Sequence, residues 1–461
     1  MRLSNKFLQS YRGTATLPQY DRATVAPGIL HIGVGAFHRA HQAVYIDSLL
    51  KKSPEWGLIG VSMQNANTRD ALAPQDGLYS VGIREAGDMS VRVIGSLMSI
   101  QQGGDAAIAA ISDPRIRLIT LTVTEKGYVN VGNINALGQT LVAGLAARAQ
   151  NGAPPISILS CDNLPDNGAR TKALVVATAQ LQAPEILRYL EQSVSFPSSM
   201  VDRITPATND TDRIDIQTMT GFEDAWPVIT EPFSQWVIED KFAAERPDFQ
   251  SVGAEVVDDL APFESMKLRL LNGAHTTMAT LGPMLDCKYV SEAALDPDLA
   301  ALIERTAKTE VFPTLTQPND ELNSYWLSLM ERFRNTSMQH ALAQIAQDSS
   351  QKVPVRLVPP IIENMNAGRP APGLTLAIAG WIASIRQAER QGKQIFDPNA
   401  QILKNIANLS VTEMIAFLCA PGAQLDTLRE MEAVQRDLAK HVGSIESNGA
   451  RSTIQQTLSE L

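Results

Sequence analysis

A lysine, an asparagine and a histidine share one apolar stretch, residues 264–275, which reads Glu-Ser-Met-Lys-Leu-Arg-Leu-Leu-Asn-Gly-Ala-His. On a helix with about 100° between successive residues, Lys267, Leu271 and His275 stack at positions i, i+4 and i+8, and Asn272 lies beside them. The neighbouring apolar side chains exclude water from the lysine, which is expected to lower its pKa toward neutrality. Such an amine can act as a general base, while an amide and an imidazole can hold an alcohol or carbonyl oxygen. Taken alone, the stretch also fits an ordinary amphipathic helix whose polar residues face water.

A glycine turn follows the first apolar run of the chain. Residues 28–32 predict a short buried strand, and residues 33–38, Gly-Val-Gly-Ala-Phe-His, lead from it into a helix. Strand, glycine turn and helix together present backbone N–H groups and a positive helix end to a pyrophosphate. The third glycine of the usual fingerprint is absent, so the motif alone also fits a plain βα connection. No cluster of acids or thiols accompanies His38 and His41, which favours packing or phosphate contact over a metal site.

Three further polar motifs directly follow runs that predict buried strands. Ligands of open α/β sheets bind at the carboxyl ends of the strands, so these motifs are expected to gather at one edge. They are residues 62–70 after the strand at 57–61, residues 124–128 after the strand at 117–123, and residues 161–165 after the strand at 156–160.

The end of the second strand bears on the choice of cofactor. In dinucleotide-binding domains an acid at this point holds the ribose hydroxyls of NAD. Here Ser62 follows the strand, no acid stands directly at its end, and Arg69 is close by. We therefore expect Ser62 to line the cofactor and expect NAD, with NADP as an open alternative.

The length and patterning predict two domains. A chain of 461 residues with 44% hydrophobic content can bury two cores. Strands and helices alternate up to about residue 258, and helical patterns alone follow. We predict an α/β, Rossmann-like dinucleotide-binding domain at 1–260 and a mostly α-helical substrate-binding and catalytic domain at 261–461. The helix that carries Lys267 is expected to face a cleft between them.

The composition excludes several classes of partner. The chain has 39 basic and 49 acidic residues, a net charge of −10 and no dense basic run, which argues against nucleic acid and anionic membranes. The three cysteines lack the paired spacing of a zinc site, so we expect a reducing cytoplasm and no metal. The N-terminus has no apolar signal core, and the chain is expected to be cytoplasmic. A helical surface leaves monomer and dimer equally open.

Six motifs together closely resemble the polyol-specific long-chain dehydrogenases. This family includes mannitol 2-dehydrogenases, arabinitol dehydrogenases and fructuronate reductases, which are also called mannonate oxidoreductases. The resemblance covers residues 20–390. The motifs occupy residues 33–41, 75–79, 124–128, 161–165, 200–204 and 266–272.

The resemblance implies a role for each site residue. It implies Lys267 as general base and acid, Asn163 and Asn272 as amides around the reacting oxygen, and His275 as the residue that orients a neighbouring hydroxyl. It also implies Asp202 as a further polar contact of the substrate. The residues implied to line the cofactor are Gly33, Gly35, Phe37, His38, Glu125, Lys126 and Val201.

Two departures from the family pattern concern the substrate. The insertion that family members usually carry after residues 125–128 is short here, at 130–135, so one wall of the site is expected to differ. Residues 344–354 resemble the fructuronate-reductase side of the family, with Gln344 where some mannitol dehydrogenases have arginine. The three cations that could meet a substrate carboxylate, and that equally fit solvated surface charges, are Arg269, Lys352 and Arg356.

These features predict reversible hydride transfer between NAD and a secondary alcohol of an open-chain polyol, ketose or hexuronate. Zinc ligands of the alcohol-dehydrogenase type are absent, and no tyrosine has a lysine four positions on, which leaves lysine as the base. Fructuronate reductase is the preferred activity. The alternatives are mannitol 2-dehydrogenase or another hexitol or pentitol dehydrogenase and, in a different class, a dinucleotide-binding scaffold without catalysis.

Overall fold

The computed structural model describes residues 1–461 apart from residue 86 and residues 129–134, and apart from the side chains of residues 125 and 126. The chain divides into two compact units, Met1–Leu260 and Ala261–Leu461. Across the described residues, helices long and apolar enough to cross a membrane are absent. The predicted fold class, a Rossmann-like α/β part followed by a helical part, is confirmed.

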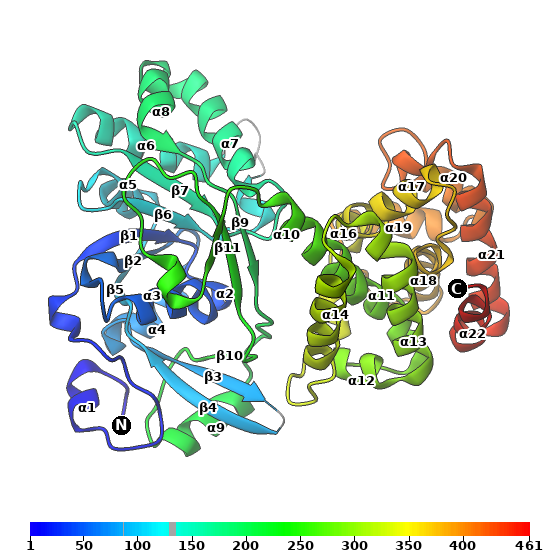
Figure 1. Ribbon diagram of the computed structural model, residues 1–461, viewed down its shortest axis with the longest axis horizontal. Helices are drawn as coiled ribbons and strands as arrows, with labels where there is room; N and C mark the ends of the chain where they lie inside the picture. Colours follow the sequence, from blue (N-terminus) through cyan, green and yellow to red (C-terminus); the bar gives the residue numbers. More distant parts are fainter. Residues whose placement is uncertain (86, 129–134) are drawn as a thin grey trace. The chain divides into compact units, whose positions relative to one another are not determined.

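A six-stranded parallel sheet organises the first unit (Figure 1). Its strands follow the order β5-β2-β1-β6-β7-β8, the doubly wound arrangement in which the strand order reverses beside β1. The strands are β1 (Pro27–Ile32), β2 (Gly57–Ser62), β5 (Leu97–Gln102), β6 (Leu118–Leu121), β7 (Ile156–Ser160) and β8 (Val194–Ser195).

Helices cover both faces of this sheet because alternate residues of β1 point to opposite sides. Ile29 packs in a core with α3 (Gln42–Leu49), whereas Leu30 and Ile32 pack in a second core with α5 (Gly104–Ser112) and α6 (Ala136–Gln150). The remaining α-helices of this unit are α1 (Asn5–Ser10), α2 (Ala36–Ala40), α4 (Asn67–Leu72), α7 (Asn167–Gln182), α8 (Leu187–Ser193) and α9 (Asp210–Thr220).

Two three-stranded sheets complete the first unit. In one of them, β3 (Tyr79–Glu85) and β4 (Asp88–Ile94) pair as an antiparallel hairpin, and β10 (Val228–Thr230) adds to β3 in parallel. In the other sheet, β11 (Gln235–Glu239) lies between β9 (Ser199–Asp202) and β12 (Glu255–Val257).

The second unit is built from helices around one apolar core. Its helix α18 is buried along most of its length and contacts α11, α21 and α22. The elements are α10 (Ala261–Met266), η7 (Lys267–Asn272), α11 (Gly273–Leu281), α12 (Val290–Leu295), α13 (Pro297–Thr306), η9 (Ala307–Val311), α14 (Asn319–Phe333), α15 (Leu342–Ile345), α16 (Ser349–Arg356), α17 (Val358–Asn366), α18 (Pro372–Arg390), α19 (Ala400–Ala407), α20 (Val411–Leu418), α21 (Glu432–Asn448) and α22 (Ala450–Glu460).

The helical pattern after residue 258 includes residues 338–347, but only α15 is helical within that range. Residues before α15 form a backbone bridge instead, in which Tyr289 pairs with Ala341. Val290 N–H donates to the His340 carbonyl and Leu342 N–H donates to the Lys288 carbonyl, both at 3.0 Å. These tertiary bonds satisfy the backbone groups that a helix would otherwise pair within itself.

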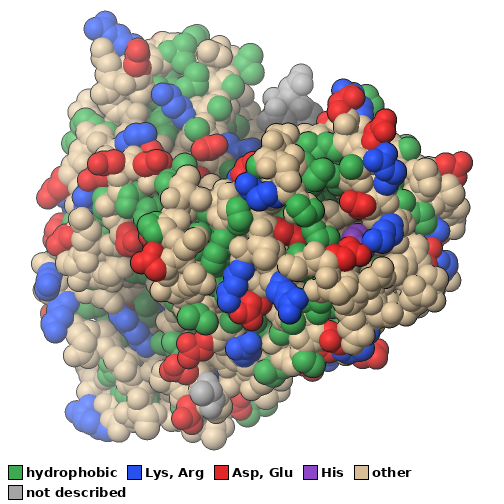
Figure 2. Space-filling view, turned by 45° about the vertical axis from the view of Figure 1, so that its right-hand side comes forward, with side chains coloured by type: hydrophobic (Ala, Val, Ile, Leu, Met, Phe, Trp, Pro, Cys, Tyr) green, Lys and Arg blue, Asp and Glu red, His purple; other side chains and the backbone are tan. Residues whose placement is uncertain are grey.

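Charged side chains of both signs are interspersed on the face of the molecule that Figure 2 shows. In the second unit, Arg386 and Arg390 form ion pairs with Glu446 at 2.8 and 2.9 Å. The charge on this face is therefore mixed in sign.

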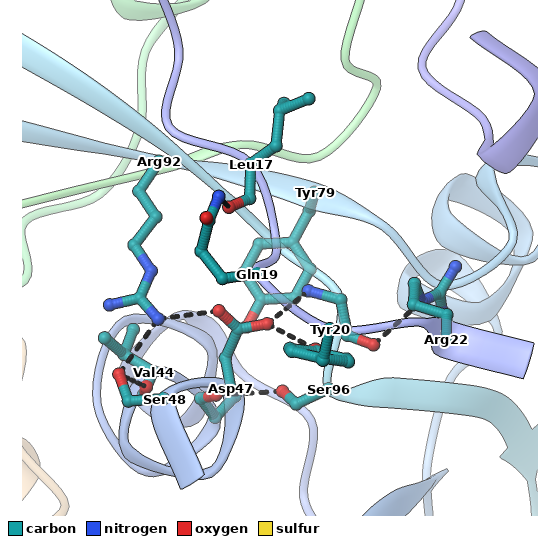
Figure 3. Close-up of polar contacts among 12 residues, drawn as sticks. Leu17, Gln19, Tyr20, Arg22, Val44, Asp47, Ser48, Tyr79, Arg92 and Ser96 are labelled. Carbon is teal, nitrogen blue, oxygen red and sulfur yellow. Dashed lines mark hydrogen bonds and ion pairs between the residues drawn. The ribbon is translucent and has the colours of Figure 1, made fainter. Parts of the chain in front are cut away.

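A buried carboxylate ties α3 to the elements around it (Figure 3). Asp47 is 3% exposed and accepts hydrogen bonds from the Tyr20 hydroxyl at 2.6 Å, the Arg92 guanidinium at 2.6 Å and the Gly95 N–H at 2.8 Å. Burial, together with the Asp47 charge, raises the pKa of Tyr20 far above its usual value, so the phenol remains a donor. The helix α3 follows the glycine turn in the chain. By holding α3 in place, Asp47 also helps to fix the position of that turn.

Replacing Asp47 with alanine should lower the free energy of unfolding by about 3 kcal/mol, the lower end for a broken buried pair, because Arg92 keeps part of its hydration. Asp47→Asn should cost less, since its amide oxygen still accepts one bond. Urea unfolding of the full chain measures both. Glu191→Ala, which removes an exposed acid on α8, is the matched control and should change stability by less than about 0.5 kcal/mol. Equal stabilities of Asp47→Ala and the control would contradict this assignment.

Candidate functional site

The glycine turn after β1 has a shape that requires glycine. Gly33 has a φ of +102°, and a Cβ there would lie 2.1 Å from the Thr122 carbonyl oxygen. Gly35 is exposed, and a Cβ there would meet only the Gly33 oxygen at 3.8 Å, so the space beside it is open. Arg39 N–H closes the first turn of α2 on the Gly35 carbonyl at 3.2 Å. The N–H groups of residues 36–38 come before that bond, so they belong to the first helical turn, in which N–H groups lack intrahelical partners.

The bulky residues of this turn are packed. His38 is fully buried and stacks on His31 with 3.3 Å between ring centroids and 11° between planes. Burial lowers the pKa of His38 well below its usual value, which keeps the ring neutral. Phe37 stacks on His41 at 5.0 Å. The contacts described for His38 are therefore those of a packed residue beneath the turn, rather than of a side chain open to a cofactor.

The other residues predicted to line the cofactor lie at strand ends or in short turns. Ser62 is the last residue of β2 and is half-buried. Val201 and Asp202 end β9, both buried, and pair with Trp236 and Gln235 of β11. The backbone of Glu125 and Lys126 lies in the turn η4 (Glu125–Tyr128). Their side chains, and most of the short segment predicted at 130–135, lie outside the described residues.

A buried carboxylate that follows β7, that of Asp162, holds the turn at 125–128 in place. Asp162 accepts hydrogen bonds from Thr124 N–H at 2.7 Å and from the Tyr128 hydroxyl at 2.9 Å. Thr124 has a φ of +64°, an uncommon conformation for a β-branched residue. Asn163, next in the chain, is exposed. Asp162 therefore links the turn at 125–128 to the strand end that presents Asn163.

In the second unit, Lys267 begins a π-helical turn, η7, so the regular α-helix predicted for this stretch is wrong at 267–272. A π-helix pairs backbone groups five residues apart instead of four. The wider turn therefore brings Asn272, five residues beyond Lys267, closer to the face of Lys267 than it would lie on a regular α-helix. Leu271 packs in the apolar core. His275 lies in α11, which continues directly from η7.

The three polar groups of this turn are buried in apolar surroundings. Lys267 is 8% exposed, Asn272 is 7% exposed and His275 is 5% exposed. Among the described residues, Asn272 Oδ1 and His275 Nε2 have no hydrogen-bond partner. Buried polar groups are nearly always paired, so two unpaired atoms beside a buried amine indicate a place for a ligand.

The surroundings of His275 are positively charged. Burial lowers the pKa of His275 well below its usual value, and nearby basic groups, among them Arg356, Arg332 and Lys267, lower it further. The ring is therefore neutral, with one donor and one acceptor nitrogen. A neutral imidazole in a positive field is suited to holding a hydroxyl or another oxygen-rich group.

Of the cations predicted to meet a carboxylate, Arg269 is already paired. It makes two bonds of 2.7 Å to the Glu363 carboxylate and one of 2.7 Å to the Thr314 carbonyl. Lys352 donates to the carbonyls of Ile345 and Gln347 at 3.1 and 2.5 Å. The bonds of Arg269 link η7 to α17 and to the Thr314 carbonyl, so Arg269 supports the helices two residues beyond Lys267. It is therefore not proposed to bind the substrate.

Arg356 and His340 both lie close to His275. Arg356 donates to the Thr276 hydroxyl at 3.1 Å, and the His340 ring meets the His275 ring edge to face at 5.3 Å. His340 belongs to none of the six motifs. The only signal in the sequence was its position four residues before Gln344, just ahead of the segment 344–354 that suggested a sugar-acid substrate.

Comparison with known proteins covers both units. Residues 27–251 match the family described as mannitol dehydrogenase Rossmann domain, and residues 259–445 match the mannitol dehydrogenase C-terminal domain. The chain is 36% identical to mannitol 2-dehydrogenase of Phaeosphaeria nodorum, over 99% of this chain and 85% of that protein. It is 35% identical to mannitol 2-dehydrogenase of Aspergillus fumigatus, over 95% and 94%.

Two solved structures resemble the whole chain. The ternary complex of Pseudomonas fluorescens mannitol 2-dehydrogenase with NAD and D-mannitol superposes with a TM-score of 0.91 at 32% identity, covering 100% of both chains. A substrate-free D-sorbitol dehydrogenase gives 0.86 at 26% identity, over 98% of this chain and 100% of that one. The resemblance predicted from the motifs is confirmed, and this chain belongs to the mannitol dehydrogenase family.

Proposed function

We propose that this chain is an NAD-dependent dehydrogenase that interconverts a secondary alcohol of an open-chain polyol and the corresponding ketone. The observation that carries the proposal is the buried π-turn with the start of α11, where Lys267, Asn272 and His275 combine an amine, an amide and an imidazole with two unpaired polar atoms. Family membership supports it, since the relatives above are named mannitol 2-dehydrogenases.

The first unit would hold the cofactor. The turn at Gly33 and Gly35 fits a dinucleotide for two reasons. The space beside Gly35 is open, and the N–H groups at the start of α2 lie before the first intrahelical hydrogen bond, where they can donate to a phosphate. Ser62, Val201 and the turn at 125–128 are proposed to line the remainder. NAD, when bound, accepts a hydride from the alcohol or returns one to the ketone.

The residues of the π-turn would handle the proton and the oxygen. In oxidation, Lys267 as the free amine takes the hydroxyl proton, and in reduction its ammonium returns that proton. Asn163 and Asn272 would donate through their amide groups to the same oxygen, a contribution of about 2.7–4 kcal/mol for each donor in comparable sites. His275, held neutral, would orient a neighbouring hydroxyl, and Asp202 is proposed as a further polar contact.

Mannitol and fructose are the first candidate pair, because several relatives carry that name and the solved Pseudomonas structure holds D-mannitol. A second candidate, fructuronate and mannonate, is supported by the positive groups around His275. A carboxylate at the far end of a sugar acid would gain from that field, and Arg356 and Lys352 are the cations proposed to meet it.

Replacing Lys267 with alanine or methionine should reduce kcat by about 100- to 10,000-fold, the range for a lost general acid and base. Affinity for NADH, measured by fluorescence titration, should change little because the cofactor residues lie in the first unit. Lys393→Ala, which removes an exposed lysine, should keep full activity. A Lys267→Ala variant with wild-type kcat and pH profile would refute the proposed base.

A substrate panel decides between the two candidate pairs. Fructose, fructuronate, tagaturonate and xylulose, each offered with NADH and with NADPH, should give turnover with NADH and with at least one six-carbon ketone. If the sugar acid is preferred, Arg356→Gln should raise its KM by about tenfold, equivalent to the loss of one charge-assisted bond, and should leave the KM of fructose unchanged. Binding of NADH without turnover of any member would favour the non-catalytic scaffold.

The link through Asp162 should matter for the cofactor. Asp162→Ala releases Thr124 N–H and the Tyr128 hydroxyl, and we expect the KM for NAD to rise about tenfold, equal to about 1.4 kcal/mol. Tyr128→Phe removes one bond of that set and should have a smaller effect. Asp105→Ala, an exposed acid on α5, is the control. An unchanged KM for NAD in Asp162→Ala would show that the turn is held by other contacts.

A further inference from the structure

His340 occupies a fixed position beside the π-turn. It lies just before α15, where the backbone bridge between Tyr289 and Ala341 holds the chain extended. The His340 carbonyl accepts the Val290 N–H at 3.0 Å, and the His340 N–H donates to the Met338 carbonyl at 2.8 Å. Its backbone is therefore anchored on both sides, and its ring is partly buried.

Two imidazole rings, each with one unpaired buried nitrogen, lie next to each other at this point. The His340 ring meets the His275 ring edge to face, with 5.3 Å between centroids and 88° between planes. Among the described residues, His340 Nδ1 and His275 Nε2 are both buried and without a hydrogen-bond partner. Phe333 covers His275 with its ring centroid 4.6 Å away. Two polar atoms in such apolar surroundings cost stability unless a third group satisfies both.

The charges around the two rings keep both of them neutral. Burial, with a contribution from the nearby Lys352 charge, lowers the pKa of His340 to about 4. His275 is likewise neutral. Each ring therefore has one N–H and one bare nitrogen, and a hydroxyl can donate to one ring while it accepts from the other. A carboxylate could only accept, so the pair is suited to a hydroxyl.

We propose that His340 is a specificity residue that, together with His275, binds one hydroxyl of the substrate away from the reacting carbon. This proposal rests on the proposed dehydrogenase function. Lys267 is among the charges that act on His275, and Lys352 acts on His340. An open-chain substrate that reacts at Lys267 would then place a hydroxyl of another carbon, the one that His275 is proposed to orient, at the two histidines.

Such a site should discriminate strongly against an analogue that lacks the hydroxyl, because the buried nitrogens would then stay unpaired. The test uses the best substrate of the panel and its monodeoxy analogues, one for each hydroxyl beyond the reacting carbon. His340→Phe keeps a ring against His275 and removes both nitrogens. His340→Asn keeps a polar group near the position of Nδ1. His441→Phe, at a buried histidine of α21, is the matched control.

We expect His340→Phe to lower kcat/KM for the full substrate by about tenfold, mainly through KM, the equivalent of one hydrogen bond. For one monodeoxy analogue, the wild type and His340→Phe should have equal kcat/KM. His340→Asn should recover part of the difference, and His441→Phe should match the wild type throughout.

A uniform loss on the full substrate and all analogues would overturn the proposal, because it would reveal a packing role only. So would unchanged kinetics in His340→Phe. If His340→Phe does not fold, His340→Asn must still alter the preference between the full substrate and one analogue, and a flat ratio overturns the proposal. A wild-type enzyme that turns over no member of the panel overturns the dehydrogenase function, and this inference falls with it.

Discussion

The candidate site depends on one constraint, the burial of an amine, an amide and an imidazole within the apolar core of the helical unit. Lys267, Asn272 and His275 are each less than a tenth exposed. The π-turn brings Asn272, five residues on, toward the face of Lys267, whereas a regular α-helix would turn it away. Leu271 packs in the core. The extra residue in the turn therefore serves packing and chemistry at once.

Contacts with neighbouring helices and hydrogen bonds of charged side chains hold this turn in place. Arg269, within η7, is held by Glu363 of α17 and by the Thr314 carbonyl. A second π-helical segment, η9, contacts η7. Its Glu310 accepts the Gly373 and Leu374 N–H groups at the start of α18, at 2.7 and 2.8 Å. π-turns are commonly found at functional sites, and here two of them lie against each other in the same core.

Much of the first unit could be predicted from the sequence. The runs at 28–32, 57–61 and 156–160 are mostly apolar or small, as is typical of strands buried on both faces. Glycine at position 33 was recognisable as a turn residue, and its positive φ explains why. The buried stack of His38 on His31 could not be predicted, because the path of the chain through the glycine turn decides whether the two rings meet, and the local sequence does not define that path.

The helical unit was harder to predict in detail, for two physical reasons. Over the six residues of η7, an apolar pattern fits an α-turn and a π-turn equally well, so the correct neighbour of Lys267 was not evident. The segment 338–341 has a helical pattern but pairs its backbone with residues 288–290, and only tertiary structure reveals this. That pairing fixes His340, which explains why no local motif marked it.

The unpaired buried atoms near the π-turn lower the stability of the fold, and the function of the site explains why they are present. Asn272 Oδ1, His275 Nε2 and His340 Nδ1 are buried without partners among the described residues, and each such atom costs about 1–3 kcal/mol. The surrounding core is dense, with Phe333, Leu270 and Met278 almost fully buried. A sequence selected for stability alone would replace these polar groups with apolar side chains of similar size. Their presence is best explained by an oxygen-rich ligand that supplies the missing hydrogen bonds. Binding of that ligand would then offset the free-energy cost of the unpaired atoms in the folded chain.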